Sequence, residues 1–143
     1  AAGAEVDGNP GSFDLITASF LQSPVELPRE NILRAALARL APGGRLVLIS
    51  HAAPPPWATA EDAAPGHRHG HGHGSGGPKF FSPDEELELL GLVRTTVFTD
   101  DGADYLVRIA EIRKREVNDP EGRAAFIDDS LVIVQRSGGT SEP

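Results

Sequence analysis

The sequence contains no cysteine and no methionine among its 143 residues. The absence of cysteine excludes disulfide bridges, thiolate metal sites, iron–sulfur clusters and cysteine nucleophiles. Positive charge is also scarce, because 13 Lys and Arg residues stand against 21 Asp and Glu residues and leave a formal net charge of -8. A protein that grips nucleic acid through its phosphates needs the opposite balance. We therefore expect no nucleic-acid partner.

Long hydrophobic runs are missing as well. Runs such as Leu46–Ile49 and Leu131–Val134 are far shorter than the roughly 20 residues that a membrane-spanning helix needs. The N-terminus has no basic segment followed by an apolar one, which a secretory signal would show. We expect no membrane partner and, by default, a cytoplasmic location. The length sets a ceiling of one domain over residues 1–143, and the opening without methionine suggests a piece of something longer.

The first half of the chain predicts a β-α-β unit. A short apolar run, Phe13–Ile16, is typical of a strand. Pro28 suits the first position of a helix, in which Ile32, Leu33, Ala36, Leu37 and Leu40 recur at helical spacing and Arg29, Arg34 and Arg39 take the outer face. Pro42-Gly43-Gly44 should stop that helix. The strand Arg45–His51 follows, with a run apolar enough for a central parallel strand buried on both faces.

The second half predicts a long loop, a helix and a hairpin. Residues 52–78 break all periodicity and are rich in proline, glycine and histidine, so we expect a long loop. Ser82, Pro83 and Glu85 form a capping box for a helix that carries Leu87, Leu89 and Leu90. A strand is expected over 105–112, and residues 92–99 are either a further strand or the approach to one. A last strand over 126–135 pairs antiparallel after the turn at 118–122. The fold class is α/β, with parallel strands followed by a C-terminal antiparallel hairpin.

The order of these motifs resembles the C-terminal half of class I S-adenosylmethionine-dependent methyltransferases. The matching motifs are Phe13-Asp14-Leu15-Ile16, Phe20-Leu21, Leu40-Ala41-Pro42-Gly43-Gly44, Leu46–Ile49, Phe80–Leu87, Glu111–Glu116 and Asp128–Val132. In that family the first motif is the fourth strand of a Rossmann-like sheet, the proline-glycine turn leads into the fifth, and a sixth and seventh close it. The resemblance covers residues 12–136, so this chain looks like a partial methyltransferase sheet.

The resemblance implies S-adenosylmethionine as the cofactor and a small-molecule methyl acceptor. Ligands of open parallel sheets bind beyond the carboxyl ends of the strands, which here points to Thr17, Ala18, Ser19 and Phe20 as cofactor-binding residues. An alternative is that Phe20 and Leu21 only pack under the following helix. The family's glycine-rich loop and ribose-binding acidic residue are absent from the chain. We therefore expect a missing N-terminal half, or a dimer that covers the open edge of the Phe13 strand.

Two further residues are candidates for work on the acceptor. His51 ends the second parallel strand, and an imidazole can exchange a proton near neutral pH and so orient or deprotonate a nucleophile; alternatively, it only hydrogen-bonds a loop. Trp57 either covers the substrate pocket or caps the apolar edge of the core. Gln22 stands where many members of the family have a histidine, so no proton transfer is expected there. Asp128 and Asp129 should point to opposite faces and lie at the surface or near a turn, and we recognise no Ser/His/Asp arrangement.

His67, His69, His71 and His73 alternate with other residues in the loop. Neutral imidazoles bind zinc, nickel or copper, but a glycine-rich loop offers no second layer of residues to orient the rings. We therefore favour a solvated loop with adventitious metal binding over a physiological metal site at these histidines.

The sequence therefore predicts methyl transfer by in-line substitution, with catalysis by positioning. Two alternatives stay open. One is a noncatalytic remnant or metal-binding module that uses the histidine-rich loop, and the other is a fragment of a nicotinamide-dependent Rossmann enzyme.

Overall fold

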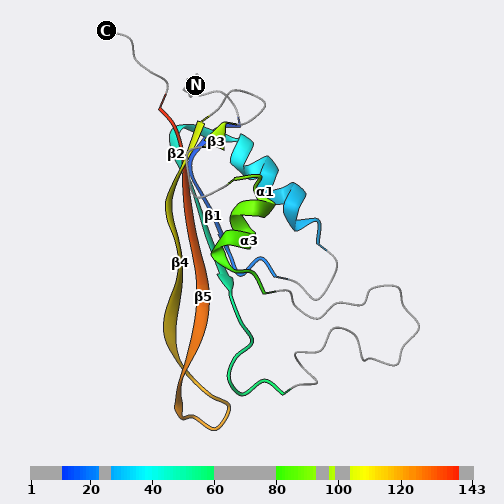
Figure 1. The fold of residues 1–143 in the computed structure, drawn as a ribbon, viewed down its shortest axis with the longest axis vertical. Helices are drawn as coiled ribbons and strands as arrows, with labels where there is room; N and C mark the ends of the chain where they lie inside the picture. Colours follow the sequence, from blue (N-terminus) through cyan, green and yellow to red (C-terminus); the bar gives the residue numbers. More distant parts are fainter. Residues whose placement is uncertain (1–10, 23–26, 60–79, 93–96, 99–103, 139–143) are drawn as a thin grey trace, which may run out of the picture.

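Five strands in the described part of the chain form one mixed sheet, which two α-helices cover (Figure 1). The computed structural model describes residues 11–22, 27–59, 80–92, 97–98 and 104–138. In chain order the elements are β1 (Phe13–Ser19), α1 (Arg29–Ala38), β2 (Leu40–His51), α3 (Pro83–Leu89), β3 (Val97–Phe98), β4 (Asp104–Asn118) and β5 (Ala124–Arg136). The expected mixed α/β class is confirmed.

The strands lie in the order β1-β2-β5-β4-β3. β1 and β2 are parallel, with Thr17 opposite Val47, and α1 forms the crossover between them. β5 lies between β2 and β4 and runs antiparallel to both. The prediction of a sheet that is parallel in its first part and antiparallel at its end is therefore confirmed. β4 and β5 continue beyond the end of β2 as a long hairpin, which closes in the predicted turn after Asn118.

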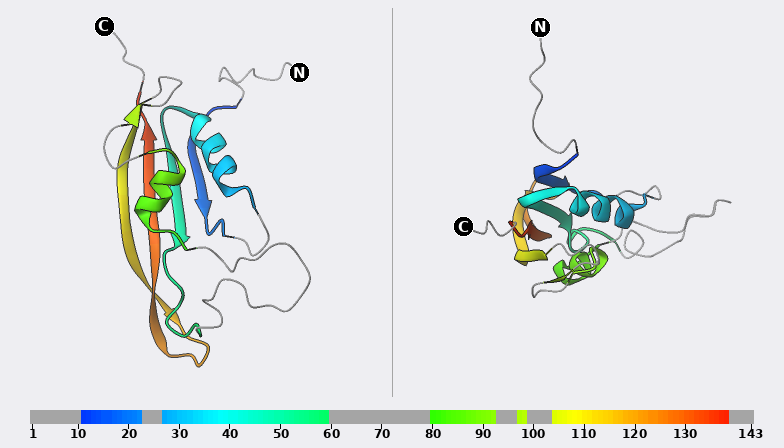
Figure 2. Two further views of the ribbon diagram at one scale, coloured as in Figure 1. Left: turned by 45° about the vertical axis from the view of Figure 1, so that its right-hand side comes forward. Right: turned by 90° about the horizontal axis from the view of Figure 1, so that it is seen from above.

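Both helices pack on the same face of the sheet, as the view from above shows (Figure 2). Leu33 and Leu37 of α1 and Leu87 of α3 are almost fully buried there. Burial of a leucine side chain stabilises a fold by about 1.5–3 kcal/mol, so this layer holds the helices on the sheet. The strand residues that complete the core are Leu40, Leu46, Leu48, Tyr105, Val132 and Val134.

Burial alternates along β2. Leu46, Leu48 and Ser50 are buried, whereas Val47 and Ile49 between them are only half-buried. The prediction that this strand is buried on both faces is wrong, because both described helices lie on the face that carries Leu46. We call the opposite face of the sheet the open face.

The turn from α1 into β2 is tighter than the sequence predicts. Pro28 is the residue that caps α1 rather than its first residue, and the helix ends at Ala38, so Pro42-Gly43-Gly44 lies within β2 instead of stopping the helix. Gly44 is required here, since a Cβ atom on it would lie 2.7 Å from the carbonyl oxygen of Phe13. This close approach brings the starts of β1 and β2 together.

The helix α3 begins as predicted. The Ser82 hydroxyl accepts a hydrogen bond from the Glu85 backbone N–H at 3.2 Å, and the Glu85 carboxylate accepts one from the Ser82 N–H at 2.8 Å. With Pro83 at the first helical position, this is the complete capping box. Of the three leucines assigned to this helix, Leu87 and Leu90 are buried and Leu89 is half-buried.

A buried ion pair joins the two helices to β2. The Arg29 guanidinium donates hydrogen bonds to both carboxylate oxygens of Glu86, at 2.6 and 2.8 Å. It also donates to the Ser50 hydroxyl at 3.1 Å, and that hydroxyl donates to Glu86 at 2.7 Å. The side chains of Arg29 and Glu86 are only 10% and 1% exposed. We call Arg29, Ser50 and Glu86 the buried clamp.

The clamp corrects the prediction that Arg29 lies on the outer face of its helix. Arg29, Leu33 and Leu37 are spaced four residues apart, so all three lie on one side of α1, and Leu33 and Leu37 define the buried side. The charge is tolerated because each nitrogen of the guanidinium donates at least one hydrogen bond: besides the bonds within the clamp, the Nε atom donates to the carbonyl of Leu21 at 3.0 Å. Phe81 adds a ring 4.5 Å from the guanidinium carbon.

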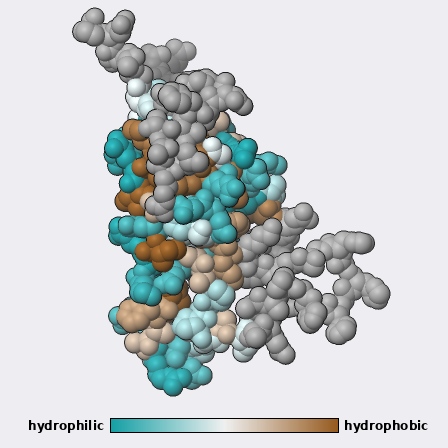
Figure 3. Space-filling view, viewed as in Figure 1, coloured by the Kyte–Doolittle hydropathy of each residue, from teal (hydrophilic) through white to brown (hydrophobic). Residues whose placement is uncertain are grey.

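The surface on the helix side is mixed in character. Hydrophilic side chains cover the helices and the tip of the β4–β5 hairpin, and hydrophobic surface appears between them along the strands (Figure 3). On the open face, Leu15 of β1 is 59% exposed. In the part of the chain that the structure describes, no helix combines the length and apolarity needed to cross a membrane.

Candidate functional site

The parallel strands β1 and β2 end side by side, at the edge where ligands of open sheets bind. Phe20 follows β1 with a φ of 53°, a left-handed conformation that is unfavourable for a bulky residue. Its backbone N–H donates to the carbonyl of Ile49 at 2.7 Å, which ties the end of β1 to β2. Strained backbone is concentrated at functional sites. This edge is therefore the first place to look for chemistry.

Gln22 fixes the end of β2. Its side-chain amide accepts a hydrogen bond from the backbone N–H of His51 at 2.8 Å and donates one to the carbonyl of His51 at 3.2 Å. The residue expected to take no part in proton transfer thus holds the backbone of the histidine that is a candidate for it.

His51 is paired with a buried carboxylate. Its Nδ1 atom lies 3.1 Å from Oδ1 of Asp129, which is only 6% exposed, while the histidine side chain is 40% exposed. A carboxylate at Nδ1 favours the tautomer that carries its proton there, which leaves Nε2 as the atom available to accept a proton.

Arg115 completes the charge balance around Asp129. Its Nε atom donates to Oδ2 of Asp129 at 2.7 Å, so the two carboxylate oxygens serve different partners. The Phe20 ring contacts both His51 and Arg115. Its centroid lies 4.6 Å from the centroid of the His51 ring and 5.5 Å from the Arg115 guanidinium carbon. We call Phe20, His51, Arg115 and Asp129 the His51 cluster.

A pocket of about 230 Å³ adjoins the His51 cluster. The loop after β2 supplies Trp57, the segment before α3 supplies Phe80, and the β4–β5 hairpin supplies the opposite wall. The residues that line it are His51, Ala53, Pro55, Trp57, Phe80, Val117, Asn118 and Ile127. The structure thus brings both residues proposed to act on the acceptor, His51 and Trp57, to one pocket.

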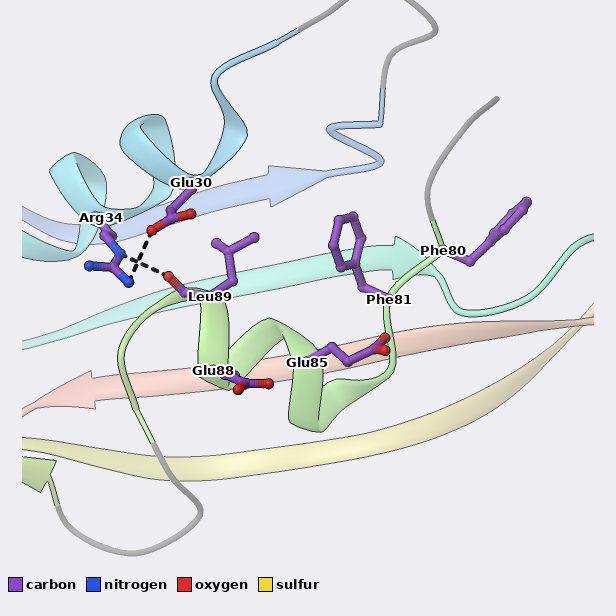
Figure 4. Close-up of a pocket in the computed structure, with 7 residues that line it drawn as sticks. All are labelled: Glu30, Arg34, Phe80, Phe81, Glu85, Glu88 and Leu89. Atoms are coloured by element: carbon purple, nitrogen blue, oxygen red, sulfur yellow. Dashed lines mark hydrogen bonds and ion pairs between the residues drawn. The ribbon is translucent and has the colours of Figure 1, made fainter. Parts of the chain in front are cut away.

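A second and larger hollow, of about 550 Å³, lies between the two helices (Figure 4). Arg34 spans it by pairing with Glu30 at 3.1 Å and donating to the carbonyl of Leu89 at 2.9 Å. Glu85 belongs to the helix cap. Because Arg34 links α1 to the end of α3 and Glu85 is used by the helix cap, we interpret the hollow as a seam between the two helices.

The residues proposed to bind the cofactor are placed slightly differently than expected. Thr17, Ala18 and Ser19 are not in a loop after the first strand but form the last three residues of β1. Thr17 and Ser19 are exposed on the open face, whereas Ala18 packs against the core under the helices. Of the two residues for which packing was the alternative, Leu21 lies against the core and Phe20 is 40% exposed in the His51 cluster.

The histidine-rich run His67, His69, His71 and His73 lies outside the described residues. Among the residues that are described, no group of three or more His, Cys, Asp and Glu side chains is placed to hold a metal ion.

Asp129 and Arg115 are functional candidates that the sequence analysis missed. Asp129 was expected at the surface, yet it is buried and bonded to His51 and Arg115. The predicted alternation itself is correct, because Asp128 instead pairs with Lys114 at 3.2 Å. No local signal identifies the pair, since His51 and Asp129 meet only through the register of β2 on β5.

Comparison with known proteins adds little. No protein-family model matches the chain, and no curated protein matches it either. Among solved structures, the chain is similar to one described under "Conversion of a Disulfide Bond into a Thioacetal Group during Echinomycin Biosynthesis", at 16% sequence identity and a TM-score of 0.49. The match covers 90% of this chain and 50% of the other, so this chain spans about half the length of that neighbour.

Proposed function

We propose that this chain takes part in S-adenosylmethionine-dependent methyl transfer to a small-molecule acceptor, as the C-terminal part of a class I methyltransferase. The observation that carries the proposal is the His51–Asp129 pair at the carboxyl end of β2, beside an aromatic pocket. A base held by a carboxylate and facing a pocket is an arrangement for removing a proton from a bound nucleophile. Two parallel strands followed by an antiparallel hairpin also support it.

The residues at the end of β1 fit one wall of a cofactor site. Thr17 and Ser19 present exposed hydroxyls on a strand whose outer edge has no described neighbour, and Phe20 adds a half-exposed ring. Hydroxyl groups suit the polar atoms of a nucleoside, and an aromatic ring attracts a cationic group such as a sulfonium. The glycine-rich loop of the family must come from outside residues 1–143.

S-adenosylmethionine supplies an electrophilic methyl group when bound. The chain's own residues then act on the acceptor: the pocket walls hold it beside His51, Asp129 keeps the imidazole in place, and Nε2 receives the proton. Arg115 neutralises Asp129 on its other oxygen, so the buried carboxylate is never left without a partner.

Calorimetric titration of the metal-stripped chain with S-adenosylhomocysteine tests the cofactor assignment. We expect a micromolar dissociation constant, and at least about tenfold weaker binding for Ser19→Tyr, which fills the proposed site. Asp14→Tyr is the matched control, because Asp14 is also exposed on β1 but lies at the other end of the strand.

Binding that appears only in a longer form of the protein would place the remaining wall outside residues 1–143 and keep the proposal. Absence of binding in both forms would overturn it.

A further inference from the structure

We propose that the pocket beside His51 takes a small, neutral aromatic alcohol of the phenol class, whose hydroxyl proton passes to Nε2 of His51. The proposal rests on the proposed function and names the acceptor class for the same site. It follows from the size, the lining and the polar groups of the pocket.

The size limits the ligand to about one ring. Sites for drug-sized molecules enclose roughly 300–1,000 Å³, whereas this pocket encloses about 230 Å³. The walls favour a flat ligand, since Trp57 and Phe80 offer aromatic faces and Pro55 and Ile127 offer apolar ones. Aromatic pairs contribute about 0.5–1.5 kcal/mol beyond the burial of their area.

The polar groups select a neutral ligand with a hydroxyl. Among the described residues that line the pocket, only His51, Trp57 and Asn118 carry hydrogen-bonding side chains, Trp57 as a donor alone, and none carries a permanent charge. A charged acceptor would therefore lose its hydration without gaining a counter-ion. A phenol needs only one polar partner, and the Nε2 atom of His51 provides it because Nδ1 is bonded to Asp129.

The transfer step balances with this assignment. The O–H bond of the phenol breaks and its proton goes to Nε2, while the oxygen forms a bond to the methyl carbon. The bond from that carbon to the cofactor's sulfur breaks, and the electron pair remains on sulfur. The phenol becomes a methyl ether, the sulfonium becomes a thioether, and the imidazolium later releases its proton to solvent.

The test uses 4-nitrophenol as the probe, because it reports binding and ionisation separately. Trp57 is the only tryptophan in the chain, so quenching of tryptophan emission reports occupancy of this pocket. The visible absorption band of the phenolate reports loss of the hydroxyl proton. At a pH where free 4-nitrophenol is mostly protonated, we expect saturable quenching with a dissociation constant of roughly 0.1–1 mM, together with growth of the phenolate band.

Two variants, each with a control, test the pocket wall and the proton acceptor His51 separately. His51→Gln should keep the quenching and lower the bound phenolate fraction at least about tenfold. Lys114→Gln, on the β4–β5 hairpin that forms the opposite wall and 72% exposed, should change neither signal. Ile127→Glu should weaken quenching at least about tenfold by placing a charge in the wall. Ile112→Glu, an exposed isoleucine outside the pocket, is its matched control.

The methyl ether 4-nitroanisole should quench without any phenolate band, because it has no proton to give. Absence of quenching by 4-nitrophenol, or quenching equally strong in Ile127→Glu, would overturn the proposal. Quenching without a phenolate band in the unmodified chain would also overturn it. None of these results requires S-adenosylhomocysteine, so failure of the acceptor assignment is distinguishable from failure of cofactor binding.

Discussion

The buried clamp and the His51 cluster contain neighbouring residues of β2. Ser50 and His51 are consecutive on β2, and their partners across the sheet, Ser130 and Asp129, are consecutive on β5. Because successive side chains of a strand point to opposite faces, one member of each pair lies under the helices and the other on the open face. The alternation of side chains along β2 therefore places Ser50 in the buried clamp and His51 in the His51 cluster.

The two clusters differ in what they leave unbonded. In the clamp, Arg29 and Glu86 are nearly inaccessible and bonded to each other twice, and Ser50 bonds both. In the His51 cluster, the histidine is 40% exposed and directs only one ring nitrogen at Asp129. A saturated buried group stabilises a fold, whereas a half-exposed imidazole whose Nε2 atom has no partner among the described residues can meet a ligand. The difference teaches which polar group to test for stability and which for binding.

The largest effect is expected from breaking the clamp. Glu86→Gln leaves the buried Arg29 guanidinium without a counter-charge, and we expect a loss of about 3–5 kcal/mol in the free energy of unfolding. Urea titration followed by circular dichroism measures it. The double variant Arg29→Met, Glu86→Leu removes both charges together and should recover most of that loss. A single variant as stable as the original would mean that the pair adds nothing.

Ser50 and Ser130 face each other on the helix-covered face of the sheet and differ in their hydrogen bonds. Ser50→Ala removes a hydroxyl that bonds both clamp partners and should cost about 1–3 kcal/mol. Ser130 is buried opposite it, but its hydroxyl has no hydrogen-bond partner among the described residues, so Ser130→Ala should be neutral or slightly stabilising. Thermal unfolding of the two alanine variants side by side makes the test. Equal losses would contradict the hydrogen-bond assignment.

A smaller effect on stability is expected from Asp129→Asn. The carboxylate loses its charge, but Arg115 is 47% exposed and keeps its hydration, so the loss should be about 1 kcal/mol. Binding should respond more strongly, because the imidazole loses the group that fixes its Nδ1 proton. We expect the phenolate signal of bound 4-nitrophenol to fall while tryptophan quenching persists, and Asp129→Glu to restore part of it.

The smallest effect on stability is expected from His51→Gln. The side chain is half-exposed and its backbone is held by Gln22, so the free energy of unfolding should change by less than about 0.5 kcal/mol. Denaturant titration of His51→Gln and Glu86→Gln under the same conditions compares their free energies of unfolding. A loss as large as that of the clamp variant would make His51 a structural residue and remove the basis of its chemical role.

Local signals predicted most of the fold. The capping box at Ser82, the turn after Asn118 and the helical spacing of Leu33 and Leu37 each depend on residues close in sequence. The structure extends the strands beyond their predicted ends, to Asn118 in β4 and Ser19 in β1, because pairing with a neighbour can lengthen a strand that its own sequence does not require.

Two of the errors concern charged residues, Arg29 and Asp129. Arg29 was placed outside because it is charged, although its spacing to Leu33 and Leu37 already put it on the buried side of α1. Helical spacing also places Glu86 on the buried side of α3, because it lies four residues before the buried Leu90. Two buried charges of opposite sign in two helices could thus have been paired in advance. The His51–Asp129 pair could not have been predicted, because it depends on the register between β2 and β5 and its two residues are 78 positions apart in the sequence.

The close approach of Gly44 to Phe13 has a consequence for insertions and deletions. It anchors the start of β2, so the number of residues from there to His51 decides which face each side chain occupies. Deleting one residue would turn the imidazole under the helices and push a serine out. Deleting two would restore the faces but move His51 about 7 Å along the sheet, out of reach of Asp129. A change of length within this stretch of β2 therefore separates His51 from Asp129.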